Sequence, residues 1–131
     1  MPTLMSTSVP TTWQSKASVR SELWPGVEFI IARITFGRRL ELLKRVRDLA
    51  VRLEYFEAGR EEKNRIEASL LGAQLDRLYI EWGLEEVQGL EIDGEPATPE
   101  SLVDRGPEEL FQEALTAVKA ECGLSEQERK N

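Results

Sequence analysis

The spacing of apolar residues along the chain predicts two long helices joined by a short connector. From Phe36 to about Glu57, apolar residues recur at alternating spacings of four and three behind Thr35, a residue type that often caps helix N-termini. Gly59 is expected to end this helix, and a second helix is predicted roughly from Glu61 to Trp82, before the stop signal of Gly83. The two helices would form an antiparallel hairpin. The alternative is one continuous helix through Gly59, which would be about 70 Å long.

Short extended segments are predicted on both sides of this hairpin. Residues 27–34 alternate like a strand with two mostly apolar faces, so the strand is expected to be covered on both sides or paired in an assembly, with a partner strand from this chain or another. Residues 84–98 predict a short extended segment around the tight turn Asp93-Gly94. The predicted fold class is mainly α (α+β with minor β): an N-terminal strand, an antiparallel helical hairpin, a short extended and turn segment, and a C-terminal helix.

Two features stand outside the helical pattern: the composition of the first 23 residues and a glycine inside the second helix. Nine of the first 23 residues are Ser or Thr and no hydrophobic period appears, so residues 1–23 are predicted to form a flexible arm and residues 24–131 a single helical domain. Trp13 in this arm is either a docking anchor for a neighbouring subunit or an incidental residue of a tail. Gly72 inside the second helix predicts a close backbone approach.

The composition excludes several classes of chemistry. Of the 131 residues, 40% are apolar, which is enough for a core, but the chain has no histidine and one cysteine, Cys122. A His-based catalytic triad, a Cys/His zinc site and an internal disulfide are thereby excluded. No phosphate-binding or nucleophile-elbow motif occurs, and Glu91, Asp93 and Glu95 do not match the spacing of an EF-hand calcium loop. No enzymatic activity, cofactor or metal site is predicted, and Cys122 is expected to be a buried, reduced thiol.

Charge is distributed unevenly along the chain. The net charge is −7, with ten basic and six acidic residues over residues 1–60 and seven basic and 18 acidic residues over residues 61–131. The acidic half would repel a polyanion, so nucleic acid is not expected as the main partner, although the basic half could contact one. No apolar run approaches the length of a membrane span and no secretory signal is visible, which predicts a cytosolic protein without a membrane partner.

The apolar stripes of the two helices contain the candidate binding residues. A two-helix hairpin has too little internal surface to hide all of its apolar side chains, and several aromatic residues fall near the helix ends. These side chains either pack into a core or, for a subset, bind an apolar helix of a partner in a groove. The residues predicted to contribute to this groove are Leu42, Leu49, Phe56, Leu78 and Trp82.

Three stretches of the sequence carry a resemblance to a known family. They are residues 27–42 (VEFIIARITFGRRLEL), residues 78–84 (LYIEWGL) and the ending at residues 123–131 (GLSEQERKN). With the helices between them, they cover about residues 24–131. This part of the chain resembles the tail assembly chaperones of long-tailed (siphovirus, lambda-like) bacteriophages and prophages.

The resemblance implies a non-enzymatic role in virion assembly. Such chaperones are thought to bind apolar helical segments of the tape measure protein, which sets tail length, and to keep them soluble until tail-tube subunits polymerise. The implied partners are the tape measure protein and the tail-tube protein. Separately from the resemblance, a homo-oligomer is one way to cover the apolar side chains that the hairpin leaves exposed. The implied location is the host cytoplasm rather than the mature virion. Two alternatives stay open: a structural virion component (a head–tail or tail-completion protein) and a small regulatory nucleic-acid-binding protein.

Overall fold

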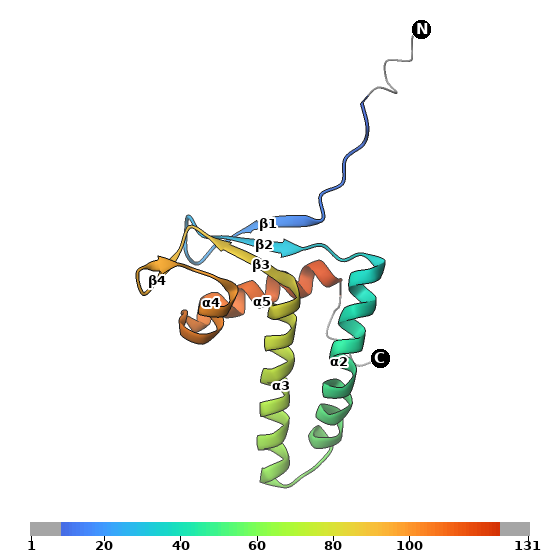
Figure 1. Ribbon diagram of the computed structural model, residues 1–131. Coiled ribbons are helices and arrows are strands. Elements are labelled where there is room, and N and C mark those ends of the chain that lie inside the picture. The colour runs from blue at the N-terminus through green and yellow to red at the C-terminus, as the bar shows by residue number, and fades with distance from the viewer. Residues whose placement is uncertain (1–8, 124–131) are drawn as a thin grey trace.

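A small antiparallel sheet lies across one end of a group of helices in the computed structural model, which describes residues 9–123 (Figure 1). Two helices form a hairpin that projects away from the sheet, and the last helix runs beneath the sheet. This arrangement confirms the predicted mainly α fold with minor β structure. In chain order the elements are β1 (Lys16–Arg20), β2 (Glu28–Ala32), α2 (Phe36–Glu57), α3 (Glu62–Gly83), β3 (Leu84–Gln88), β4 (Glu91–Ile92), β5 (Glu95–Pro96), α4 (Pro99–Arg105) and α5 (Glu108–Cys122).

The predicted helical hairpin is present as α2 and α3, and the alternative of one continuous helix is wrong. Thr35 caps α2, because its hydroxyl oxygen accepts a hydrogen bond from the backbone N–H of Arg38 at 3.2 Å. The Arg38 side chain then reaches the other helix. Its Nη2 donates a 2.5 Å hydrogen bond to the carbonyl oxygen of Trp82, and its guanidinium lies 4.6 Å from the centre of the indole ring. Arg38 thereby joins the start of α2 to the end of α3.

Helices cover only one face of the three-stranded sheet (Figure 1). The central strand β2 pairs antiparallel with β1 on one edge and with β3 on the other, so both partner strands come from this chain. Phe29 and Ile31 of β2 are completely buried, whereas Glu28 and Ile30, which alternate with them, are partly exposed. The prediction that this strand is covered on both faces is therefore wrong, and its backbone groups find partners without an assembly.

The structure differs from the predicted flexible arm at residues 16–20. These residues form β1, which pairs with β2 along its whole length. A short polar strand of this kind depends on its neighbour for backbone hydrogen bonds, which composition alone does not reveal. Before the strand, Trp13 is mostly exposed, and the guanidinium of Arg33 lies 5.6 Å from the centre of its ring. Residues 1–8 of the predicted arm and residues 124–131 lie outside the described part of the chain.

Glu113 ties the turn between β1 and β2 to α5. Its carboxylate accepts hydrogen bonds from the Ser21 hydroxyl at 2.5 Å and from the backbone N–H groups of Glu22 at 2.7 Å and Leu23 at 3.4 Å. Burial opposes ionisation of this carboxyl group, but the hydrogen bonds outweigh burial and lower the pKa of Glu113 below its ordinary value of 4.5. The contact fastens β1 to the last helix of the fold.

We expect Glu113→Gln to lower the free energy of unfolding by about 1 kcal/mol at neutral pH, because an amide oxygen accepts weaker hydrogen bonds than a carboxylate. A carboxyl group whose pKa is lower in the native state than in the unfolded state stabilises the fold fully at pH values above its unfolded-state pKa. That stabilisation is lost as the pH falls through the native pKa. The difference between wild type and variant should therefore shrink when urea unfolding is measured at about pH 3.

The matched control for this prediction is Glu108→Gln. The Glu108 carboxylate makes no hydrogen bond or ion pair with any residue between 9 and 123. Its substitution should change the free energy of unfolding little at either pH. Equal losses for the two variants would contradict the role assigned to Glu113.

The segment between α3 and α5 contains the predicted tight turn and a short capped helix. Asp93 and Gly94 adopt positive φ angles of 53° and 83° and connect β4 to β5, which confirms the turn predicted at this dipeptide. Thr98 and Ser101 form a reciprocal capping box at the start of α4, and Pro99 lies in its first turn. α4 packs against both α3 and α5.

The core lies between the sheet, α3 and α5. In α5, Leu110, Ala114, Val118 and Cys122 are completely buried. Burial raises the pKa of the Cys122 thiol to about 11, so the thiol stays protonated and unreactive at neutral pH. The expectation of a buried cysteine is confirmed.

Gly72 lies in the middle of α3 with open space around it. A Cβ atom added to Gly72 would have no neighbour within 4 Å, so the predicted close backbone approach is wrong. We expect Gly72→Ala to raise the free energy of unfolding by roughly 0.5–1 kcal/mol, measured by urea unfolding, since alanine favours the helix interior more than glycine does. Gly37→Ala, in the first turn of α2 and also in open space, should give a smaller gain. A loss of stability in Gly72→Ala would contradict this expectation.

Candidate partner-binding groove

The five residues predicted to form a partner-binding groove lie at or near the contact between α2 and α3. Leu42 and Trp82 are only 1% and 3% exposed and belong to the hydrophobic core. Leu49, Phe56 and Leu78 are half-buried, and Leu78 packs against the core. The structure brings all five into one hairpin, but Leu42 and Trp82 have no free surface to offer a partner.

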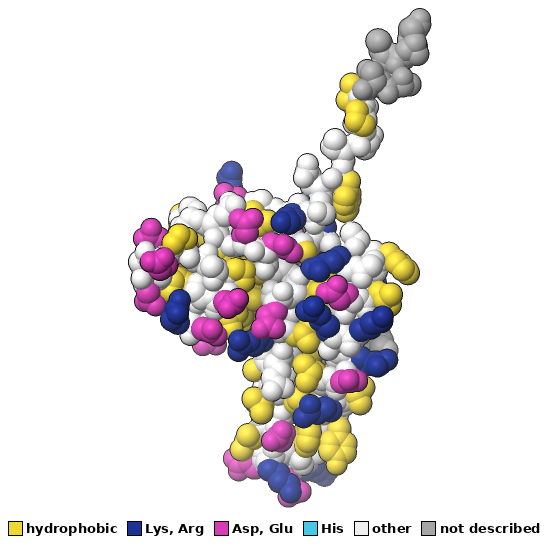
Figure 2. All heavy atoms as spheres, viewed as in Figure 1, with side chains coloured by type: hydrophobic (Ala, Val, Ile, Leu, Met, Phe, Trp, Pro, Cys, Tyr) yellow, Lys and Arg dark blue, Asp and Glu magenta, His cyan; other side chains and the backbone are white. Residues whose placement is uncertain are grey.

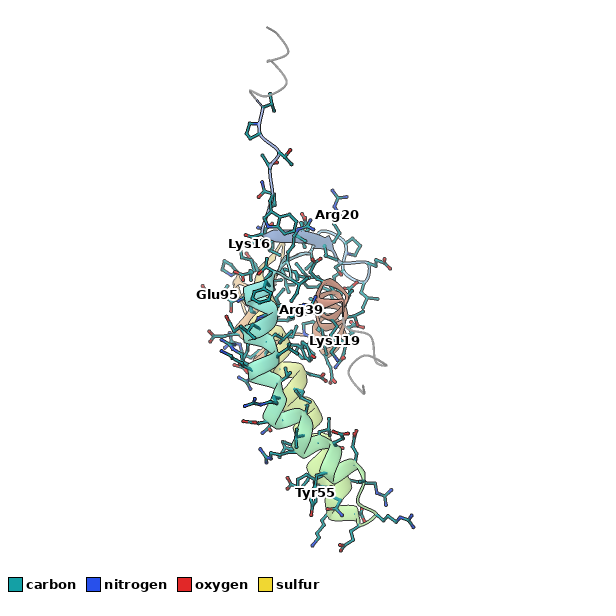
Figure 3. All side chains as sticks on the ribbon, turned by 90° about the vertical axis from the view of Figure 1, so that its right-hand side faces the viewer. Lys16, Arg20, Arg39, Tyr55, Glu95 and Lys119 are labelled. Carbon is teal, nitrogen blue, oxygen red and sulfur yellow. The ribbon has the colours of Figure 1, made fainter. Side chains whose placement is uncertain are left out.

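The exposed apolar surface of the hairpin lies instead on the outer sides of its two helices. Hydrophobic side chains cover much of its projecting end (Figure 2). Tyr55, near the tip, is far from the sheet that carries Lys16 and Arg20 (Figure 3). The hairpin side chains concerned are between 46% and 73% exposed: Leu40, Leu43, Val51 and Tyr55 on α2, and Ile66 and Leu70 on α3. In the sequence, Leu43, Ile66 and Leu70 lie beside the main apolar stripes of the two helices, and this position was the available signal.

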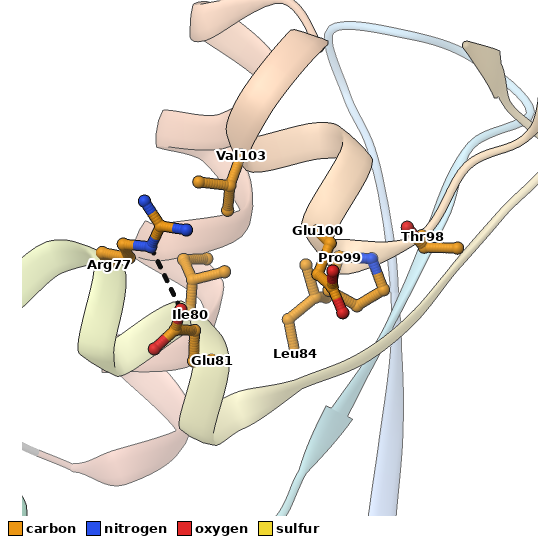
Figure 4. A pocket seen from close by; sticks show the side chains of 8 residues that line it. All are labelled: Arg77, Ile80, Glu81, Leu84, Thr98, Pro99, Glu100 and Val103. Carbon is orange, nitrogen blue, oxygen red and sulfur yellow. Dashed lines mark hydrogen bonds and ion pairs between the residues drawn. The ribbon is translucent and has the colours of Figure 1, made fainter.

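Two adjoining hollows lie along α3, and Arg77 and Val103 line both of them. One, of about 430 Å³, lies between the end of α3 and the start of α4 (Figure 4). The other, of about 610 Å³, lies between the middle of α3, α4 and the start of α5. Because they share Arg77 and Val103, the two hollows are together named the α3 groove. Its larger apolar side chains are Leu70, Ile80, Leu84, Leu102, Val103 and Phe111.

The α3 groove lies on the side of α3 turned away from α2 and continues toward the hairpin tip. Ile66, Leu70, Ala73 and Arg77 follow one another at spacings of four, three and four, which places them on one face of the helix. Leu70, Ala73 and Arg77 line the groove, and Ile66 extends the same face beyond it. An apolar stripe therefore leads from the projecting end of the hairpin into the groove.

Arg77 lies where the two hollows meet. Its Nε donates a hydrogen bond to Glu81 at 3.1 Å, and its Nη2 lies 3.8 Å from a carboxylate oxygen of Asp104 on α4 (Figure 4 shows the contact with Glu81). The hydrogen bond to Glu81 and the charge of Asp104 raise the pKa of Arg77. Arg77 therefore links α3 to α4, through Glu81 on its own helix and Asp104 on α4.

The charged residues that line the α3 groove are mostly acidic. Asp76 forms an ion pair with Lys119 at 3.3 Å, and Glu81 is engaged by Arg77. Glu100 and Glu108 also line the groove and make no ion pair within residues 9–123. Of the groove's apolar side chains, Ile80, Leu84 and Leu102 are at most 4% exposed, so the surface open to a partner is formed by Leu70, which is 53% exposed, and by the half-buried Val103 and Phe111. The groove therefore combines this apolar surface with a rim that carries free negative charge. Such a surface suits an apolar helix flanked by basic residues.

Residues 9–123 contain no group of three or more His, Cys, Asp or Glu side chains that could hold a metal ion. No helix within this range is long and apolar enough to cross a membrane. A comparison of the chain with protein-family models, curated proteins and solved structures finds no match.

Proposed function

We propose that this protein is a non-enzymatic chaperone that holds an amphipathic helix of the phage tape measure protein in the α3 groove. The observation that carries the proposal is the exposed apolar stripe of Ile66 and Leu70, which leads directly into the floor of the groove. A free helical surface of this kind suits the capture of a second apolar helix. The sequence resemblance to tail assembly chaperones supports the choice of partner.

The length of the groove limits the segment that it can hold. From Ile66 to its end at Gly83, α3 runs for about 26 Å at 1.5 Å per residue. A partner helix of about five turns has this length and can lay a continuous apolar stripe along it. The loss of freedom on association offsets much of the gain from apolar burial, so a single contact of this size is weak. Many such contacts along one long client act together through multivalency.

The weakness of each contact fits a transient role. Unassembled apolar helices aggregate unless they are covered, and a coat of chains that each carry a net charge of −7 keeps the client dispersed. Polymerising tail-tube subunits then displace the chaperone, because each contact dissociates readily. The protein acts in the host cytoplasm and is absent from the finished virion.

Co-expression with the tape measure protein tests this proposal. Wild-type chain should increase the soluble fraction of the tape measure protein and co-purify with it. The double variant Ile66→Asp, Leu70→Asp should lose this capture while keeping its far-UV circular dichroism, because both side chains are more than half exposed. The control is Phe36→Ser, at an apolar position that is 86% exposed and lies outside the groove, and this variant should capture the client normally.

Two results would count against the proposal. If the double variant captures the tape measure protein as well as wild type does, the α3 groove is not the binding site. If wild-type chain captures no segment of the tape measure protein, the chaperone function is wrong. The alternative of a structural virion component predicts the protein in purified phage particles, which mass spectrometry of those particles detects.

A further inference from the structure

We propose that two copies of this chain associate through the outer face of α2, side by side and antiparallel around a two-fold axis. This inference does not depend on the proposed function, because it concerns the side of the hairpin opposite the α3 groove. It rests on an apolar ridge that no described element covers and on a charge pattern within α2 that is complementary to itself.

The apolar ridge lies on the face of α2 that is turned away from α3. Among the described elements, only α3 packs against α2 over more than isolated contacts. Leu43, Arg47, Val51 and Tyr55 follow one another at intervals of four residues, which places them on one ridge, and Leu40 lies beside it. The four apolar members are 46% to 73% exposed. Ridges of this spacing are the surfaces through which helices most often pack against each other.

The charges of α2 separate into a basic and an acidic half. The first half, up to Arg47, carries five basic residues and one acidic residue, and the second half, from Asp48, carries three acidic residues and one basic residue. An antiparallel pair of α2 helices places each basic half against an acidic half, whereas a parallel pair places like charges together. The residues of the two halves are Arg38, Arg39, Glu41, Lys44, Arg45 and Arg47, then Asp48, Arg52, Glu54 and Glu57.

Several of these charges lack an ion-pair partner in the part of the chain that the structure describes. Arg39 and Lys44 in the basic half, and Glu54 and Glu57 in the acidic half, form no ion pair with residues 9–123. In an antiparallel pair centred between Arg47 and Asp48, Arg39 of one copy comes close to Glu57 of the other. Lys44 likewise comes close to Glu54 of the second copy. The occupant that this face fits best is therefore a second copy of the same helix.

The same register pairs the apolar side chains. A two-fold axis between Arg47 and Asp48 brings Leu40 of each copy opposite Tyr55 of the other. The pairs Leu43 with Val51 and Arg39 with Glu57 are then displaced from direct opposition by one residue, and the longer side chains of Lys44 and Glu54 span a displacement of three residues, about 4.5 Å along the helix. Each contact then occurs twice, as in any isologous interface. The Arg47 side chains near the axis lie beside Asp48, their ion-pair partner at 3.7 Å within one chain. The α3 grooves of both copies stay open in this arrangement, because α3 lies between each groove and the shared face.

Light scattering and sedimentation velocity of the purified full-length chain test this proposal. The wild-type chain is measured over concentrations that rise to roughly 100 µM. Within this range it should form a dimer, whose mass is twice the chain mass of 14.9 kDa. The variant Leu43→Asp, Val51→Asp should be a folded monomer by circular dichroism. Ile66→Asp, a matched exposed apolar position on α3, should remain a dimer. A wild-type monomer over this concentration range, or a dimer that survives both substitutions on α2, would overturn the proposal.

Charge exchange tests the antiparallel register separately. Lys44→Glu alone and Glu54→Lys alone should each raise the dimer dissociation constant by about tenfold, because each substitution places like charges together twice in the interface. The combined variant Lys44→Glu, Glu54→Lys should recover most of the wild-type affinity. A combined variant that is weaker than either single variant would contradict the antiparallel pairing.

Discussion

Trp82→Ala is expected to lower the free energy of unfolding by about 3–5 kcal/mol. The Trp82 side chain is 3% exposed and belongs to the core cluster, so its removal leaves a cavity that the surrounding helices cannot fill. The substitution also removes the ring on which the Arg38 guanidinium lies, at 4.6 Å from its centre. Urea unfolding followed by circular dichroism measures the loss, and Phe36→Ala, at a position 86% exposed and outside both proposed interfaces, should change the stability by less than about 0.5 kcal/mol.

Trp82→Phe separates the packing of this residue from its polar group. The Trp82 indole N–H is buried and has no hydrogen-bond acceptor among the described residues. Phenylalanine removes this unsatisfied donor and keeps most of the apolar volume, so we expect a loss of only about 1 kcal/mol. If Trp82→Ala instead unfolds like wild type but fails to capture the tape measure protein, Trp82 belongs to the binding surface that the sequence predicted and not to the core.

The helical hairpin could be predicted because the information for it is local. The four-and-three spacing from Leu42 onward, the cap at Thr35 and the break at Gly59 all act within a few residues of chain. The turn at Asp93-Gly94 and the capped start of α4 at Thr98 are local in the same sense. These features depend on residues that are close together in the sequence, so they can be predicted without knowledge of the tertiary packing.

The strand β1 could not be predicted, because its stability comes from a partner. Residues 16–20 are mostly exposed, and although polar and apolar residues alternate along them, the alternation covers only five residues and its apolar members are only Ala17 and Val19. Their backbone groups pair with β2, and the following turn is held by Glu113, which is 92 positions from Ser21. A segment rich in Ser and Thr can form either a flexible arm or an edge strand, so its composition does not distinguish the two.

The binding groove was missed for a related reason. Periodicity identifies which faces of α2 and α3 are apolar, but both helices are apolar over more than one face. Which of these faces is covered depends on where α4 and α5 dock, and that docking joins residues distant in sequence, such as Lys119 and Asp76. The strongest stripes include Leu42 and Trp82, which are buried in the core. Ile66 and Leu70, beside the main stripe of α3, remain exposed.

Gly83→Ala is expected to lower the free energy of unfolding by about 1–3 kcal/mol. A Cβ atom at Gly83 would lie 2.5 Å from Cγ1 and 3.3 Å from Cγ2 of Val118, which is completely buried in α5. These methyl groups sit next to the backbone and cannot swing away as the end of a long side chain could, so α3 and α5 must move apart. The same substitution at Gly72 of the same helix meets open space and should stabilise the protein, which makes it the matched control.

Val118→Ala should rescue part of this loss. Alone it leaves a small cavity between α3 and α5, and we expect it to be destabilising. In the double variant the methyl group of alanine 83 fills part of the space that the valine methyl groups vacate. The loss for the double variant should therefore be smaller than the sum of the two single losses by about 1 kcal/mol. Urea unfolding of the wild type, both single variants and the double variant measures this coupling. Strictly additive losses would mean that Gly83 and Val118 are not in contact, and that the close packing of α3 on α5 is not the reason for glycine at this position.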